Sequence, residues 1–311
     1  MTTPTATYRL QLRPGFGFDQ VAAIAPYLKS LGISHVYLSP YLQAAPGSTH
    51  GYDVTDHSQV NRELGGTPAH ARMVEALRGQ GLGQVIDVVP NHMATSTPDN
   101  RFWWDLLEHG RCSRYANYFD VDFQPIESRL HDKVLVPILG DHYGRVIEAG
   151  EIRLERVAGR FRIIAHGSHV LPLDPASVGE LLQRAAERSG SEELAFIADA
   201  LVHLPKPHDS TGEDARRRER DVHVAYRMLE RLLVDPSVAV SVDAQVAQTN
   251  DSIDALDQLI ERQHYRIAYW RMARHDLDYR RFFDVDNLAA LRIERSEVFH
   301  DVHQMILSWV D

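Results

Sequence analysis

Residues 84–92 have the sequence QVIDVVPNH, in which apolar side chains dominate up to the proline and Asp87 is the only charged residue. A short run rich in valine and isoleucine, ended by proline, is typical of a strand, and this one is apolar on both faces apart from Asp87. We therefore expect a strand at 84–89. Two earlier segments, TYRLQL at 7–12 and SHVYLS at 34–39, predict further strands because they are short and contain aromatic or β-branched residues.

Helical patterns separate these three strands. Residues 18–31 place apolar side chains three or four positions apart and end before Gly32, and residues 69–78 have a similar apolar stripe. The order strand, helix, strand, helix, strand predicts βαβ crossovers and a parallel sheet. The connection at 40–68 is long and polar, whereas the turns from helix to strand are short, as in a (β/α)8 barrel. A doubly wound dinucleotide-binding sheet is disfavoured, because residues 15–17 form an isolated GxG and no GxGxxG follows the first strand.

A different pattern begins at residue 93. Residues 133–139 are apolar, and the alternation in 145–164 predicts two or three antiparallel strands. Apolar stripes predict two helices within 177–204 and one helix each at 219–233, 252–273 and 296–310, the last of them capped by Ser296. The arginine-rich run at 216–220 is predicted to be a solvated helix face.

The predicted fold class is α/β. We expect the N-terminal part of a TIM (β/α)8 barrel, with about three βα units and a large mixed α+β insertion after strand 3. Residues 1–92 would hold the first three barrel strands and two helices. Residues 93–275 would form the insertion, a small β region followed by a helical subdomain. Residues 276–311 would return to the barrel with its third helix and stop before strand 4.

Composition excludes several classes of protein. The 311 residues carry 33 Lys and Arg against 43 Asp and Glu, a net charge of −10, which argues against nucleic-acid binding. The single cysteine, Cys112, allows neither an internal disulfide nor a multi-cysteine metal site. No apolar run approaches the ~18 residues of a membrane span, and residues 1–7 lack the pattern of a signal peptide. We expect a soluble cytoplasmic protein without a cofactor.

Two polar clusters lie just beyond predicted parallel strands, namely HGYDVTD at 50–56 and DVVPNH at 87–92. In a barrel both would lie on the catalytic face. A tyrosine ring can stack on a sugar, and imidazoles and carboxylates can hydrogen-bond its hydroxyl groups. The alternative is structural: Asp53, Asp56 and Asp87 could simply hold loops by accepting hydrogen bonds from the backbone.

These two clusters together resemble the alpha-amylase family of retaining α-glucan enzymes. A closer resemblance is to one branch of it, the maltooligosyltrehalose synthases. It is carried by TYRLQL and by the blocks at 38–66, 262–271 (RQHYRIAYWR) and 279–294 (YRRFFDVDNLAALRIE). Asp286-Asn287 is a small departure, since Asn-Asp is expected. The resemblance implies intramolecular transglucosylation, in which the reducing-end α-1,4-linked glucose of a maltooligosaccharide becomes α,α-1,1-linked.

The resemblance also implies roles for single residues. Tyr52 would stack on the glucose at the cleavage subsite, His50 and His92 would contact its hydroxyl groups, and Asp87 would orient its neighbours. Asn91 corresponds to a calcium ligand in many amylases, but one matched oxygen is weak evidence for a cation that takes 6–8, so no metal is expected. The predicted substrate-binding residues are His50, Tyr52, Asp53, Asp87, Asn91 and His92.

A retaining enzyme needs a nucleophile and a general acid/base. The family places the nucleophile in an Arg-x-Asp-His pattern after strand 4 and the acid after strand 5. The segment 292–294 (RIE) has no following histidine and precedes the last predicted helix, so we reject it. No catalytic residue is expected in this chain, which should be inactive alone, whereas the full-length enzyme should be a monomer acting on maltooligosaccharides. The alternatives are another amylase-family hydrolase or transferase, and a truncated glucan-binding module without catalysis.

Two other features are interpreted structurally. Within 262–271, helical spacing would put Tyr265 and Tyr269 on a packing face. His166 and His169 are predicted to lie in a loop without an acidic partner, which argues against a metal site.

Overall fold

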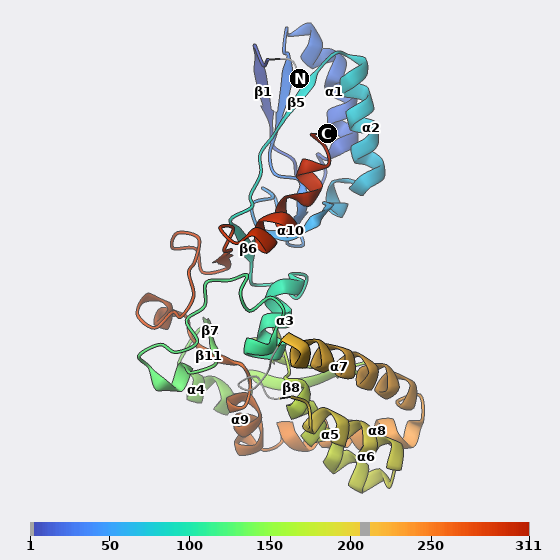
Figure 1. Ribbon diagram of the computed structural model, residues 1–311, viewed down its shortest axis with the longest axis vertical. Coiled ribbons are helices and arrows are strands. Elements are labelled where there is room, and N and C mark those ends of the chain that lie inside the picture. The colour runs from blue at the N-terminus through green and yellow to red at the C-terminus, as the bar shows by residue number, and fades with distance from the viewer. Residues whose placement is uncertain (1–2, 206–211, 311) are drawn as a thin grey trace. The chain divides into compact units, whose positions relative to one another are not determined.

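The computed structural model describes residues 3–205 and 212–310 (Figure 1). The chain forms two compact units, each described here by itself. One comprises Met1–Arg101 together with Arg281–Asp311 and is called the split unit. The other, Phe102–Arg280, is called the central unit.

The split unit is built on the predicted parallel sheet. Strands β1 (Thr7–Leu10), β2 (His35–Leu38) and β5 (Gly83–Ile86) are hydrogen-bonded in that order, all parallel. Helices α1 (Phe18–Ser30) and α2 (Gly66–Gly79) pack against each other on one side of it (Figure 1). The predicted βαβαβ order and the α/β class are therefore confirmed.

One face of this sheet forms the core of the unit. Val36 and Leu38 of β2 pack against Val21 and Leu28 of α1 and Met73 of α2, and all five side chains are at 0% exposure. The other face is different. The residues of β5 are all half-buried, and most of β1 is exposed. Arginine and tyrosine side chains on β1 and β2 make that face polar.

The connection predicted as a loop contains two strands. β3 (Leu42–Ala44) and β4 (Val54–Val60) pair antiparallel, with register shifts in β3. In β4 only Val54 and Val60 are apolar, and five polar residues separate them, so the sequence lacks the apolar–polar alternation that predicts a strand.

Residues far apart in sequence complete the split unit. β6 (His92–Ala94) pairs antiparallel with β12 (Leu288–Ala290). Helix α10 (Ser296–Leu307) packs against β4, and the Trp309 ring stacks on His70 with centroids 5.0 Å apart. The predicted C-terminal helix is confirmed, but its N-cap is Arg295 and Ser296 already lies in the first turn.

The central unit combines helices with small sheets. β8 (Ile152–Val157), β9 (Arg160–Ala165) and β10 (His169–Pro172) form an antiparallel sheet in which β9 is central, as the alternation predicted. Residues 145–148 are not part of it, because they are helical. The helices are α3 (Arg101–His109), α4 (Tyr143–Glu148), α5 (Pro175–Ser189), α6 (Glu192–Val202), α7 (Gly212–Leu232), α8 (Pro236–Asn250) and α9 (Ile253–Glu261).

The predicted long helix at 252–273 is wrong. Helix α9 ends at Glu261, and β11 (Tyr265–Tyr269) follows, paired in parallel with β7 (Val134–Leu139). Tyr265 and Ile267 are buried, which is the two-residue period of a strand. The same residues are also compatible with the spacing of a helix. They form a strand because they pair with β7, which is distant in sequence.

The arginine-rich run is also not uniformly solvated. Arg218 of α7 is 3% exposed and donates to Asp174 Oδ1 at 2.7 Å, and His264 Nε2 lies 3.3 Å from the same oxygen. Asp174 also caps α5 by accepting from Ser177 N. A buried carboxylate therefore ties α5, α7 and the start of β11 together.

Removing the buried cation should cost far more than removing its neighbour. Arg218→Ala would leave the Asp174 charge buried with an incomplete set of partners, at a cost of roughly 3–5 kcal/mol. Arg217 is 65% exposed and pairs with Asp221 at 3.5 Å, so Arg217→Ala should cost about 0–1 kcal/mol. Thermal melting of the full-length variants measures both. Equal losses for the two would contradict the structural role assigned to Arg218.

Candidate functional site

The strand register of the split unit brings three polar side chains to one face. Arg9 of β1 lies beside Tyr37 of β2, and Tyr37 lies beside Val85 of β5. Asp87 follows Val85 by two positions, and its backbone N–H continues the ladder to Leu38 O at 3.1 Å. Because side chains two apart in a strand share a face, Arg9, Tyr37 and Asp87 all lie opposite the α1–α2 face.

Tyr52 reaches this face from the connection between β3 and β4. Its hydroxyl donates to Asp87 Oδ2 at 2.6 Å, and the Tyr37 hydroxyl donates to the same oxygen at 3.2 Å. Arg9 donates to the Tyr52 hydroxyl at 3.2 Å. The hydrogen bond to Asp87 and partial burial raise the pKa of Tyr52, while Arg9 acts in the opposite direction. The half-buried ring is thus held at its hydroxyl end by the sheet.

His92 supports Tyr52 from its backbone side. Its Nε2 lies 2.9 Å from the Tyr52 carbonyl oxygen, and its Nδ1 lies 2.9 Å from the Asn91 side-chain oxygen. Its ring stacks on Phe282 at 3.9 Å between centroids, and burial lowers its pKa. Both partner atoms are oxygens, so a neutral ring can donate to only one of them. Both contacts lie within the protein, so His92 positions the segment carrying Tyr52.

His50 and Asp53 occupy the turn around Tyr52. His50 Nδ1 accepts from the Tyr52 N–H at 3.1 Å, and its side chain is 52% exposed. Asp53 accepts from the Ser48 hydroxyl, which in turn accepts from Gly51 N–H. Asp53 thus tightens the turn, as the structural alternative anticipated. At Gly51, φ is +77° and a Cβ would lie 2.1 Å from Pro40 O, so only glycine fits.

The six predicted residues are all in the split unit, but they divide into two groups. Tyr52 is half-buried, and His50 and Asn91 are exposed. The side chains of Asp53, Asp87 and His92 make hydrogen bonds within the protein. Sequence reasoning missed Arg9, Tyr37, His57 and Phe282. Arg9 and Tyr37 could have been noticed in the sequence, since each is a polar residue inside a segment predicted to be a strand.

His57 joins β4 to the segment after β5. It is 3% exposed, its Nε2 donates to Val89 O at 2.9 Å, and its Nδ1 is buried without a partner in the described part of the chain. Burial lowers the pKa of His57 to about 4. The neutral ring therefore holds Val89 within the stretch that carries Asp87.

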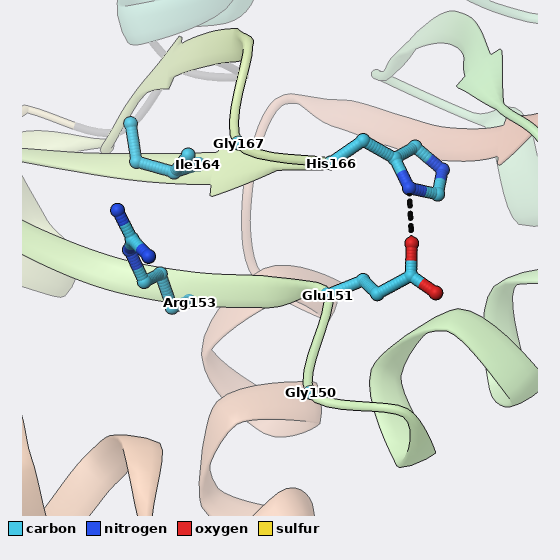
Figure 2. A pocket seen from close by; sticks show the side chains of 6 residues that line it. All are labelled: Gly150, Glu151, Arg153, Ile164, His166 and Gly167. Carbon is cyan, nitrogen blue, oxygen red and sulfur yellow. Dashed lines mark hydrogen bonds and ion pairs between the residues drawn. The ribbon is translucent and has the colours of Figure 1, made fainter.

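A separate hollow of about 220 Å³ lies in the central unit (Figure 2). Glu151, just before β8, and His166, just after β9, point toward each other there, and His166 Nδ1 donates a hydrogen bond to the Glu151 carboxylate. His166 Nε2 accepts from Gly140 N–H at 3.1 Å. The prediction that His166 lacks an acidic partner is therefore wrong, but both of its nitrogens are occupied and it is a structural residue.

Within residues 3–205 and 212–310, no three His, Cys, Asp or Glu side chains are grouped so that they could hold a metal ion. None of the helices in the same ranges has the length and apolar character needed to span a bilayer.

His57 should make the split unit sensitive to acid. Its unfolded form binds a proton below about pH 6.5 and its folded form only below about pH 4, so folding stability falls as the pH drops between these values. The loss should reach roughly 3 kcal/mol. His57→Gln keeps a donor near Val89 O and cannot become charged. Melting temperatures of the full-length variant between pH 7.5 and 4 should fall less steeply than those of the wild type, and identical slopes would contradict this.

Comparisons with known proteins place this geometry in context. The family model "Alpha amylase, catalytic domain" matches residues 20–136. A Mycobacterium tuberculosis protein named provisionally as a maltooligosyl trehalose synthase is 33% identical over 98% of this chain and 29% of its own length. The solved maltooligosyltrehalose synthase of Arthrobacter ramosus is 31% identical, with a TM-score of 0.65 over 98% of this chain and 29% of that one.

Matches to other enzymes of the alpha-amylase family cover less of this chain. The intracellular maltogenic amylase of Bacillus subtilis is 29% identical over 107 residues, which is 34% of this chain and 17% of that enzyme. The predicted resemblance is therefore confirmed: part of the chain matches an alpha-amylase catalytic domain, and the whole chain is similar to maltooligosyltrehalose synthases. The chain spans less than a third of the length of these relatives.

Proposed function

Because the chain is similar along its whole length to maltooligosyltrehalose synthases, we propose that it is the N-terminal portion of such an enzyme. The full-length protein would convert the reducing-end α-1,4-linked glucose of a maltooligosaccharide into an α,α-1,1 linkage. The coverage supports this choice over other amylase-family hydrolases and transferases. Those match about a third of the chain, whereas the synthases match the central unit as well.

The proposal gives each unit a place in the larger fold. Strands β1, β2 and β5 would be the first three strands of a (β/α)8 barrel, and α10 would be its third helix. Residues 93–275 would be an insertion after strand 3, between barrel segments 1–92 and 276–311. The compact units, which divide near residues 101 and 281, are compatible with this scheme. The protein would work in the cytoplasm without cofactor, nucleic acid or membrane.

The anchoring of Tyr52 supports a sugar-binding role for this face of the split unit. The Tyr52 hydroxyl is fixed by Asp87 and Arg9, so the ring can present one orientation to a pyranose ring at little entropic cost. The exposed His50 and Asn91 side chains could hydrogen-bond the sugar hydroxyl groups. Asp53, Asp87 and His92 would hold this surface in place rather than contact the sugar.

Cleavage of the glycosidic bond needs two catalytic carboxyl groups. Under the proposal, neither of them belongs to this chain. A retaining mechanism uses a carboxylate nucleophile that attacks the anomeric carbon, and a carboxylic acid that protonates the departing oxygen. Under the proposal Asp87 holds the site instead of attacking the sugar, since its Oδ2 accepts from the Tyr52 and Tyr37 hydroxyl groups. The catalytic pair would lie in the part of the relatives beyond the matched length.

Product analysis of the full-length protein tests the function. Maltopentaose should become a non-reducing pentasaccharide, so reducing ends should disappear without change in chain length. Glucose and maltose as main products would instead show an amylase-type hydrolase. Binding of maltopentaose without turnover would support the glucan-binding module.

Substitution of Tyr52 tests whether its ring packs on the sugar. Tyr52→Ala removes the ring and should lower kcat/KM for maltopentaose by about 10- to 100-fold, or ~1.4–2.8 kcal/mol. Tyr52→Phe keeps the ring but loses its anchor and should have a smaller effect. The control is Tyr27→Ala, because Tyr27 is 59% exposed on α1 and therefore lies on the other side of the sheet. An unchanged kcat/KM for Tyr52→Ala would contradict the site.

A further inference from the structure

The central unit contains a second cavity with an unassigned set of polar groups. It has a volume of about 200 Å³ and is lined by residues of β7, α4, β11 and the segment around residue 130. Its volume is below the ~300–1,000 Å³ of pockets that enclose drug-sized ligands. It therefore suits one ring of a ligand whose remainder stays outside.

The floor of the cavity is apolar. Leu130 and Leu135 are each 2% exposed and Ala268 is 9% exposed, and the three form one buried cluster. Tyr143 and Tyr269 add aromatic rings to the lining. The Tyr269 ring is half-buried and lies 5.2 Å from the His142 ring, which also lines the cavity. Rings beside an apolar floor suit the C–H faces of a sugar.

Polar groups around this floor have unused hydrogen-bonding capacity. Arg266 binds Glu261 only through Nη1, at 3.0 and 3.1 Å, which leaves its other donors without a partner in the described part of the chain. Over the same residues, no hydrogen bond is found for the Asp276 carboxylate or the His142 ring nitrogens, although Asp276 interacts electrostatically with Arg129. The cavity thus offers hydrogen-bond donors on Arg266, acceptors on Asp276, and the His142 ring, which can donate or accept.

Charge argues against an anionic ligand. Both arginines that line the cavity are already paired with glutamates, Arg266 with Glu261 and Arg129 with Glu127. Asp276 adds a negative charge to the lining. A phosphate or carboxylate would find no unpaired cation, whereas hydroxyl groups, which both donate and accept, match the free groups.

We propose that this cavity binds one glucosyl unit of an α-glucan, as a site in the central unit separate from the Tyr52 site in the split unit. The choice of glucose rests on the proposed function, whereas the preference for a neutral polyhydroxylated ring rests on the cavity itself. The Tyr269 ring would pack on the pyranose, and Asp276 and Arg266 would hydrogen-bond its hydroxyl groups.

A cyclic glucan separates the two sites. β-Cyclodextrin has no reducing end, so it cannot be a substrate for rearrangement at a chain end, and it can still offer a glucosyl edge to the cavity. Calorimetric titration of the full-length protein should detect its binding. Tyr269→Ala should weaken that binding at least fivefold, and the conservative Asp276→Asn at least twofold. The control is Phe196→Ala, because Phe196 is 64% exposed on α6 and does not line this cavity.

The outcomes distinguish the two proposals. Absence of β-cyclodextrin binding, or equal affinity in the wild type and both variants, would overturn the second site, whatever the products from maltopentaose. Weakened binding in Tyr269→Ala and Asp276→Asn, with Phe196→Ala unchanged, would support it. It would do so even if the wild type formed no non-reducing product, in which case only the proposed function would fail.

Discussion

The hydrogen bond from the Tyr52 hydroxyl to Asp87, 2.6 Å long, is the constraint on which the candidate site depends. It joins the connection between β3 and β4 to the end of β5 and fixes the ring against a rigid parallel sheet. A hydrogen bond to a charged acceptor is about twice as strong as a neutral one. Arg9, which donates to the Tyr52 hydroxyl, and Tyr37, which donates to Asp87, complete the cluster on the polar face of the sheet.

The remaining residues of the site follow from that constraint. His92 holds the Tyr52 carbonyl, Asp53 holds the turn that precedes it, and His57 holds the chain after Asp87. Each makes its contacts inside the protein. A binding surface that must recognise a flexible sugar gains affinity when its own side chains are ordered in advance, and these contacts provide that order.

Local patterns predicted the elements whose formation depends on nearby residues. The apolar periods of α1, α2 and the parallel strands lie within single segments, so the βαβαβ order was predictable. The errors involve distant partners. Residues 265–269 became a strand because β7, about 130 residues earlier, pairs with them. Arg218 is buried because Asp174, 44 residues away, accepts its hydrogen bond. The clusters containing Tyr52 and Asp87 were visible in sequence, but Arg9 joined them only through the strand register.

A crystal structure of the full-length protein with a bound maltooligosaccharide tests the central claim most directly. The account predicts a pyranose ring packed on the Tyr52 ring, with the Tyr52 hydroxyl still within hydrogen-bond distance of Asp87. A sugar bound in the active site away from Tyr52, or a Tyr52 ring turned away from Asp87 to reach it, would contradict the account.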